Sequence, residues 1–129
     1  MSQALRIQAT VDAMTAAFAA GDVDGILATY EPGAVVVGEP GMPSTGTPAL
    51  RALFERFIAV APKFTFLAHE VVEAGDIALH FNVWRMAGIA PDGSAIADGG
   101  LSVAVLRRQA DGDWLMVIDD PYGDRLLKR

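Results

Sequence analysis

The apolar residues of this chain change their spacing near its middle, and that change constrains the fold more than any other feature. Up to residue 62, apolar side chains recur every three or four positions, as at Ile7, Val11, Met14 and Phe18. This spacing places them along one face of a helix. From residue 64 onward, apolar and polar residues alternate instead, which is typical of strands with one buried face. Helices followed by antiparallel strands predict an α+β domain.

The helical half divides into three predicted helices, at residues 3–20, 23–31 and 47–61. Gly21 is expected to end the first helix because glycine tolerates the left-handed backbone of a C-cap. Asp22 is a favourable N-cap for the second helix. A Pro-Gly pair after residue 31 and a proline at residue 62 are expected to stop the second and third helices.

The remaining elements are expected to be extended. Residues 34–37 predict a short strand, and residues 38–46, which hold three glycines and two prolines, predict a loop. The length of 129 residues is that of one domain, so a single domain spanning 1–129 is expected. Four further strands are predicted, at residues 64–73, 77–86, 95–108 and 114–118.

The composition narrows the function classes. A net charge of −6 argues against nucleic acid and anionic membranes as partners, because both need a basic face. The chain has no cysteine, which excludes a disulfide scaffold, a thiolate nucleophile and a Cys-ligated metal. Residues 1–20 lack the pattern of an export signal, so a cytoplasmic protein is expected.

The alternation of the strand at 77–86 predicts two faces. Phe81, Val83 and Arg85 share the face that we expect to be the inner one. An arginine there needs a carboxylate or an anionic ligand, since an unpaired buried charge is costly. Asp98 and Asp119, at strand ends, are expected at the same opening, so the three charged groups are candidate catalytic residues that position and deprotonate a water. The alternative is a structural ion pair between Arg85 and one of these aspartates.

The opposite face of that strand carries His80, Asn82 and Trp84. A large aromatic exposed on a sheet typically marks a partner surface. A homodimer through this face is therefore expected.

Helical apolar stripes and one tyrosine supply the candidate ligand contacts. Tyr30 is the polar group on such a stripe; its hydroxyl is expected either to contact a ligand or to bond a backbone group. The stripes themselves are expected either to fill a core or to line a cavity for a small apolar or amphipathic ligand. The candidate binding residues are Met14, Phe18, Tyr30, Phe54, Phe57 and Phe81.

A metal site is not expected. His69 and His80 are the only histidines, and His69 and Glu70 point to opposite faces of one strand. A three-ligand zinc site needs more convergent donors. The aspartate pairs near the C-terminus do not match a twelve-residue calcium loop. No cofactor is expected either.

Several motifs give the chain a family resemblance. Gly21-Asp22-Val23-Asp24-Gly25-Ile26 after a first helix, Thr45-Gly46 before a third, and the terminal run from Leu106 to Trp114 closing with Ile118-Asp119-Asp120-Pro121 resemble the SnoaL-like and ketosteroid-isomerase-like proteins of the nuclear-transport-factor-2-like superfamily. The resemblance covers roughly residues 5–122. It implies a cone-shaped curved antiparallel sheet packed on three helices, with an apolar cavity and often a dimer.

The same resemblance argues against steroid isomerisation. The isomerases carry a tyrosine on the first helix, an aspartate base after the first strand and a protonated aspartate on the long strand. The matching positions here hold Met14, Gly38 and, near residue 104, alanine. None of these side chains donates a hydrogen bond or takes a proton. Glu39, one residue from the base position, replaces the base only if the loop shifts.

Three functions are therefore consistent with the sequence. The first is a small-molecule-binding cavity protein of SnoaL-like type. The second is a cofactor-free lyase, isomerase or hydrolase that uses Asp98, Arg85 and Asp119. The third is an interaction module whose interior is filled by side chains. The first two predict a cavity of a few hundred Å³, by the usual size of ligand pockets.

Overall fold

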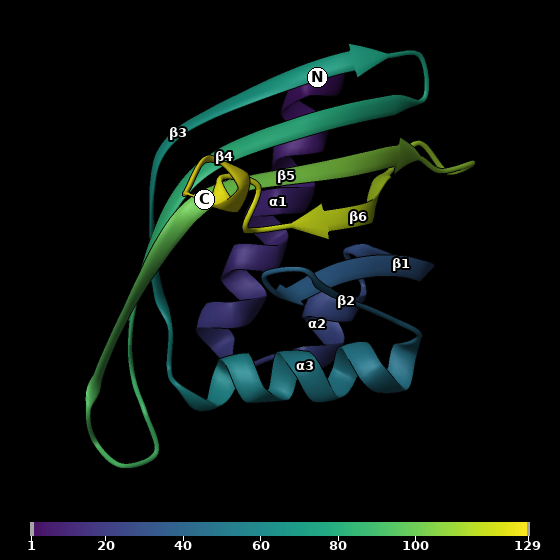
Figure 1. Ribbon diagram of the computed structural model, residues 1–129. Helices are drawn as coiled ribbons and strands as arrows, with labels where there is room; N and C mark the ends of the chain where they lie inside the picture. Colours follow the sequence, from purple (N-terminus) through teal and green to yellow (C-terminus); the bar gives the residue numbers. More distant parts are fainter. Residues whose placement is uncertain (1, 129) are drawn as a thin grey trace.

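A computed structural model describes residues 2–128 and has three α-helices and one curved, six-stranded sheet (Figure 1). The sheet order is β2-β1-β6-β5-β4-β3, and its two edge strands do not pair, so the sheet stays open. This arrangement confirms the predicted α+β fold. The elements are α1 (Gln3–Ala20), α2 (Val23–Leu27), β1 (Tyr30–Glu39), β2 (Met42–Thr45), α3 (Thr47–Ala59), β3 (Lys63–Ala74), β4 (Ile77–Ile89), β5 (Ala95–Arg108), β6 (Trp114–Asp120) and the short 3₁₀ helix η1 (Arg125–Lys128).

The link between α1 and α2 forms as its residues predict. Gly21 ends α1 in the left-handed conformation, with φ of 66°. The Asp22 side chain then caps α2 by accepting the Gly25 N–H at 2.9 Å. These two caps turn the chain sharply and set α2 beside the end of α1.

The predicted second helix was too long, because strand pairing takes over its last residues. Helix α2 ends at Leu27, and Tyr30 already pairs with Met116 of β6. Strand β1 runs parallel to β6, and its register shifts between Tyr30 and Val35, where Pro32 lies. A proline is tolerated there because the irregular pairing requires no N–H from it.

The predicted loop at 38–46 is also corrected. Its second half forms strand β2, which pairs with β1 through Val35↔Thr45 and Val37↔Pro43. Gly41, with φ of 75°, makes the turn between them. Proline in β2 is compatible with pairing because β2 is the edge strand of the sheet.

The two faces of β4 are the reverse of those expected from the sequence. His80, Asn82 and Trp84 are buried on the inner face, whereas Val83 and Arg85 are exposed on the outer one. Alternation defines two faces but does not say which one the helices cover. The exposed aromatic surface expected at His80, Asn82 and Trp84 is therefore absent, and these three residues cannot form the predicted dimer interface.

Strands β3, β4 and β5 bend together, with the helices on their concave side (Figure 1). One end of this concave side is filled by side chains, among which Ile7, Leu106, Trp114 and Met116 are at most 1 % exposed. The opposite end contains a largely apolar hollow. The fold thus separates a packed end from a hollow end.

Candidate functional site

The hollow is a pocket of about 120 Å³ between α1, α3 and the inner face of the sheet. It is smaller than the cavity of a few hundred Å³ that the sequence led us to expect. Its lining is mostly apolar and aromatic. The lining residues are Met14, Thr15, Phe18, Tyr30, Val36, Phe54, Phe57, Val60, Pro62, Phe64, Phe66, Asn82, Trp84, Met86, Asp98, Ser102, Asp119, Pro121 and Tyr122.

Aromatic rings from four elements form the apolar wall. Phe18 of α1 packs edge-on against Phe54 of α3 at 5.8 Å between ring centroids, and against Phe64 of β3 at the same distance. Tyr30 lies 5.4 Å from Phe54. Such packing holds the rings in fixed orientations, so the wall is preformed.

Most candidate binding residues lie in this lining. Met14, Phe18, Tyr30, Phe54 and Phe57 line the pocket. Phe81 does not, because it belongs to the outer face of β4 with Arg85. Ligand contact by the five residues stays a prediction.

A row of polar side chains crosses this otherwise apolar inner face. Asn82 of β4 pairs in register with Ser102 of β5. The Ser102 hydroxyl lies 3.4 Å from Asp119 Oδ1 on β6. The Tyr30 hydroxyl, on β1, lies 2.6 Å from Asp119 Oδ2. Four neighbouring strands thus each contribute one polar group to the pocket.

Asp119 is the buried ionisable group of this row, with 6 % of its surface exposed. Burial raises the pKa of its carboxyl, while the hydrogen bonds from Tyr30 and Ser102 oppose the rise. Burial and the nearby Asp119 charge also raise the pKa of Tyr30 well above its usual value. The tyrosine therefore stays a neutral hydrogen-bond donor.

The Tyr30 hydroxyl has a second acceptor, Met14 Sδ, at 3.3 Å. When Asp119 is ionised, the hydroxyl donates to the carboxylate. When Asp119 is protonated, it can donate to Tyr30 Oη, and the tyrosine proton can turn to the sulfur, which is a weak acceptor. The hydrogen bonds of Tyr30 and Asp119 are therefore satisfied whether Asp119 is ionised or protonated. A carboxyl group that takes up and releases a proton requires this.

The three candidate catalytic residues do not all meet at one site: Asp98 lines the pocket with Asp119, and it lines a second, more open hollow with Arg85. Asp119 is buried in the pocket, and Asp98 is an exposed residue of its lining. Arg85 lies on the outer face of β4 and makes no ion pair among residues 2–128. The structural ion pair predicted for Arg85 is absent among the described residues because the faces of β4 are reversed, and a catalytic role for Arg85 stays a prediction.

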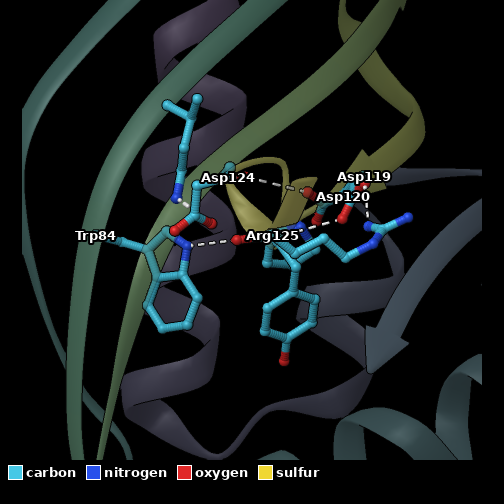
Figure 2. A network of polar contacts seen from close by, with 9 residues as sticks. Trp84, Asp119, Asp120, Asp124 and Arg125 are labelled. Carbon is cyan, nitrogen blue, oxygen red and sulfur yellow. Dashed lines mark hydrogen bonds and ion pairs between the residues drawn. The ribbon is translucent and has the colours of Figure 1, made fainter. Parts of the chain in front are cut away.

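The segment after β6 closes one side of the pocket. Figure 2 shows the Trp84 indole donating to a backbone oxygen of this segment, that of Pro121, at 2.8 Å. Asp124 accepts the Leu101 N–H at 3.2 Å, and Arg125 pairs with Asp120 at 3.2 Å. Tyr122 and Pro121, which line the pocket, are held in place by these contacts.

Metal binding finds no support among residues 2–128, where no group of three or more histidine, aspartate and glutamate side chains is placed to hold an ion. His69 and His80 stack with ring centroids 6.1 Å apart, and His80 Nε2 lies 2.7 Å from Gln8 Oε1. Within the same described range, no helix is both long and apolar enough to cross a membrane.

Sequence reasoning missed Asn82, Ser102 and Trp84 as pocket residues. One feature of the sequence, the charge of Arg85, indicates the correct face for two of them. Arg85 is charged, and a charged residue on a half-buried strand usually marks the solvent face. That rule assigns Asn82 and Trp84 to the inner face.

Comparisons with known proteins support the observed fold. The family model described as SnoaL-like domain matches residues 11–117. No curated protein matches the chain.

Several solved structures share the fold. A ketosteroid isomerase-like protein from Erwinia carotovora atroseptica is 20% identical with a TM-score of 0.76, over 88% of this chain and 90% of that one. A nuclear-transport-factor-2-like protein of unknown function from Pseudomonas putida KT2440 is 23% identical with a TM-score of 0.75, over 93% and 87%. A structure from Catenulispora acidiphila in complex with S-DNPA is 20% identical with a TM-score of 0.78, over 99% and 100%.

Proposed function

The chain belongs to the SnoaL-like family, and on that basis we propose that it binds a small, largely apolar molecule in the pocket between α1, α3 and the sheet. The observation that carries this proposal is the combination of a preformed aromatic wall with a row of polar groups on one side. Ligand sites typically join a mostly apolar lining to a few placed polar groups. The complex of the Catenulispora acidiphila protein with S-DNPA further supports a binding role for this fold.

The two tryptophans of the chain offer a direct test. Trp84 lines the pocket, whereas Trp114 is packed at the opposite end and donates its indole N–H to Gln3 at 2.8 Å. Single-ring compounds such as phenol and toluene are added to ¹⁵N-labelled protein, and the two indole N–H resonances are followed. Binding in the pocket shifts the Trp84 resonance and leaves that of Trp114 in place.

A pocket-filling variant is the matched control. Thr15 lies on α1 in the pocket lining, so Thr15→Phe adds a ring inside the hollow. The shift of the Trp84 resonance is expected to disappear in this variant. Equal shifts of both indoles, or none in the wild-type protein, contradict the proposal.

A second candidate function, proton transfer catalysis, is favoured by the Tyr30–Asp119 pair. The resemblance places the isomerase tyrosine at Met14 and the isomerase acid near Ala104. Tyr30 Oη lies 3.3 Å from Met14 Sδ, and Asp119 is the register partner of Ala104. The pair thus supplies a hydroxyl and a carboxyl close to both positions, from different strands.

In this second function, Asp119 acts in its protonated form. It donates a hydrogen bond to a ligand carbonyl oxygen, which stabilises the negative charge that develops when water removes an adjacent C–H proton. The enolate carbon then takes a proton from the hydronium ion, whose protons have exchanged with the solvent, and Asp119 ends as it began. Gly38, at the base position, has no side chain for the removal, so a slower reaction than that of the isomerases is expected.

Deuterium exchange measures this activity without a known substrate. The incorporation of deuterium from D₂O next to the carbonyl of 2-cyclohexenone is followed by proton NMR. Asp119→Ala removes the donor and is expected to lower the protein-dependent rate by about 100-fold, the usual effect of losing one hydrogen-bond donor to a developing oxyanion. Asp120→Ala is the control, because Asp120 pairs with Arg125 outside the pocket. Unchanged exchange in Asp119→Ala excludes the mechanism.

A further inference from the structure

Asn82 lines the pocket with a side chain whose buried acceptor atom has no hydrogen-bond partner. Its side chain is 7 % exposed and lines the hollow. Its Oδ1 atom is the one buried side-chain nitrogen or oxygen within residues 2–128 that has no hydrogen-bond partner. A buried polar atom without a partner is unfavourable because it has lost its hydration, so a ligand that supplies a donor gains affinity.

The dimensions of the pocket limit the size of that ligand. Its volume is about 120 Å³, and an engineered cavity of about 150 Å³ in another protein holds benzene. One ring with few substituents therefore fits. A fused four-ring ligand of steroid size needs more space than the rings of Phe18, Phe54 and Phe57 leave.

The charges of the lining limit the ligand further. Among the described lining residues, the charged side chains are Asp98 and Asp119, and no lysine, arginine or histidine is present. An anionic ligand would lose its hydration without meeting a cation, and it would lie near a buried carboxyl. Both effects oppose its binding.

We propose that the pocket selects an uncharged, single-ring molecule that bears a hydroxyl or amine donor, and that Asn82 Oδ1 recognises this donor. The inference deepens the proposed binding function and depends on it. Asn82 lies next to the Ser102–Asp119–Tyr30 group, so the donor of the ligand is anchored beside the carboxyl.

Three single-ring probes separate the effect of a donor group on the ligand from the effect of a negative charge. Phenol, toluene and benzoate are titrated into the full-length protein at neutral pH, and the Trp84 indole resonance reports binding. Phenol is expected to bind at least about tenfold more tightly than toluene, because one buried acceptor gains a partner. Benzoate is expected to give no saturable shift.

Asn82→Leu tests whether Asn82 accepts a hydrogen bond from the ligand, since leucine has nearly the same volume but no acceptor. In this variant the affinities for phenol and toluene are expected to lie within about twofold of each other. Arg85→Leu is the matched control, because it removes a polar side chain from the outer face of the same strand and is expected to keep the full preference for phenol. If Asn82→Leu does not fold, Asn82→Val, whose side chain favours strands, carries the same expectation.

The outcomes distinguish this inference from the function on which it rests. If neither phenol nor toluene moves the Trp84 resonance, the proposed binding function fails, and this inference fails with it. If phenol and toluene bind equally to the wild-type protein, or if the Asn82 variant keeps the tenfold preference, recognition by Asn82 is wrong while the binding function stands. Binding of benzoate more tightly than phenol overturns the selection against anions.

Discussion

The two ends of the concave side of the sheet are built from similar residues but have different interiors. At the packed end, Trp114, Leu106 and Ile7 leave no free space and are at most 1 % exposed. At the hollow end, Phe18, Phe54 and Phe57 surround a pocket of about 120 Å³. The number of aromatic residues alone therefore does not decide whether side chains fill the interior of this fold or leave a pocket.

Strand length accounts for the difference. Strand β6 ends at Asp120, whereas its neighbour β5, and β4 on the far side of β5, extend well beyond that point. At the packed end α1 lies against β6, where Thr10 donates to the Trp114 carbonyl at 2.7 Å. At the hollow end β6 is replaced by the irregular segment after residue 120, which covers the pocket less completely.

The largest expected effect is at the packed end. Trp114→Ala removes a fully buried indole, together with its hydrogen bond to Gln3. The loss in unfolding free energy is expected to be about 3–5 kcal/mol. Urea unfolding followed by circular dichroism measures it. A loss below about 1 kcal/mol would mean that this end is not tightly packed.

The equivalent truncation at the hollow end is expected to cost less. Phe57 is half-buried and faces the pocket, so Phe57→Ala is expected to lower the unfolding free energy by about 1–2 kcal/mol, in proportion to the apolar area lost. It also enlarges the pocket. Titration with 2-naphthol, whose two rings exceed the wild-type volume, is expected to shift the Trp84 resonance only in this variant.

The hollow end is expected to lose stability as the pH rises. Burial raises the pKa of Asp119 in the folded protein, so above about pH 4, where the unfolded carboxyl ionises, the folded state binds more protons than the unfolded state. Stability then decreases until the pH passes the folded pKa. Asp119→Asn has no carboxyl to ionise at this position. The unfolding free energy of the variant minus that of the wild type is therefore expected to increase with pH. A constant difference between pH 4 and pH 8 contradicts the prediction.

The packed end is expected to respond in the opposite direction. Burial, together with the charge of His69, lowers the pKa of His80, while Asp12 on α1 opposes the shift. Below about pH 6.5, the unfolded state therefore binds the proton more readily, and stability decreases as the pH falls through the window down to the folded pKa. His80→Gln keeps a polar partner for Gln8 and removes the titration. The unfolding free energy of His80→Gln relative to that of the wild type is expected to increase as the pH falls. The same difference at pH 7 and at pH 5 would refute this prediction.

The smallest effect is expected outside both ends. Arg85 is exposed on the outer face and has no ion pair among the described residues. Arg85→Ala is expected to change the unfolding free energy by no more than about 0.5 kcal/mol and to leave phenol binding unchanged. A large change in either measurement would show that the outer face contributes to the site.

The sequence predicted much of the fold because its strongest signals are local. The spacing at Ile7, Val11 and Phe18 indicated α1, and Gly21 and Asp22 indicated the turn into α2. Strand β5 has the predicted bounds, since its alternation ends at clear turn residues. The errors at residues 28–31 and 42–45 arose where pairing with distant strands overrides local preference.

The candidate site was predicted only in part, for a similar reason. Helical stripes placed Met14, Phe18 and Phe54 on the correct faces, because a helix has one apolar side. Alternation in β4 left two equivalent choices, and the wrong one assigned Arg85 to the interior and Trp84 to the surface. The polar row of Asn82, Ser102 and Asp119 appears only when three strands are aligned in register.

By itself the sequence determined most of the helices and strands and that the chain belongs to the α+β class, because periodicity and capping act over a few residues. The tertiary structure alone decided which face of each strand is buried, that β1 lies parallel to β6, and where a hollow remains. These features depend on contacts between residues far apart in the chain, such as Tyr30 with Asp119. Local sequence patterns do not predict which distant segments come into contact in the folded chain.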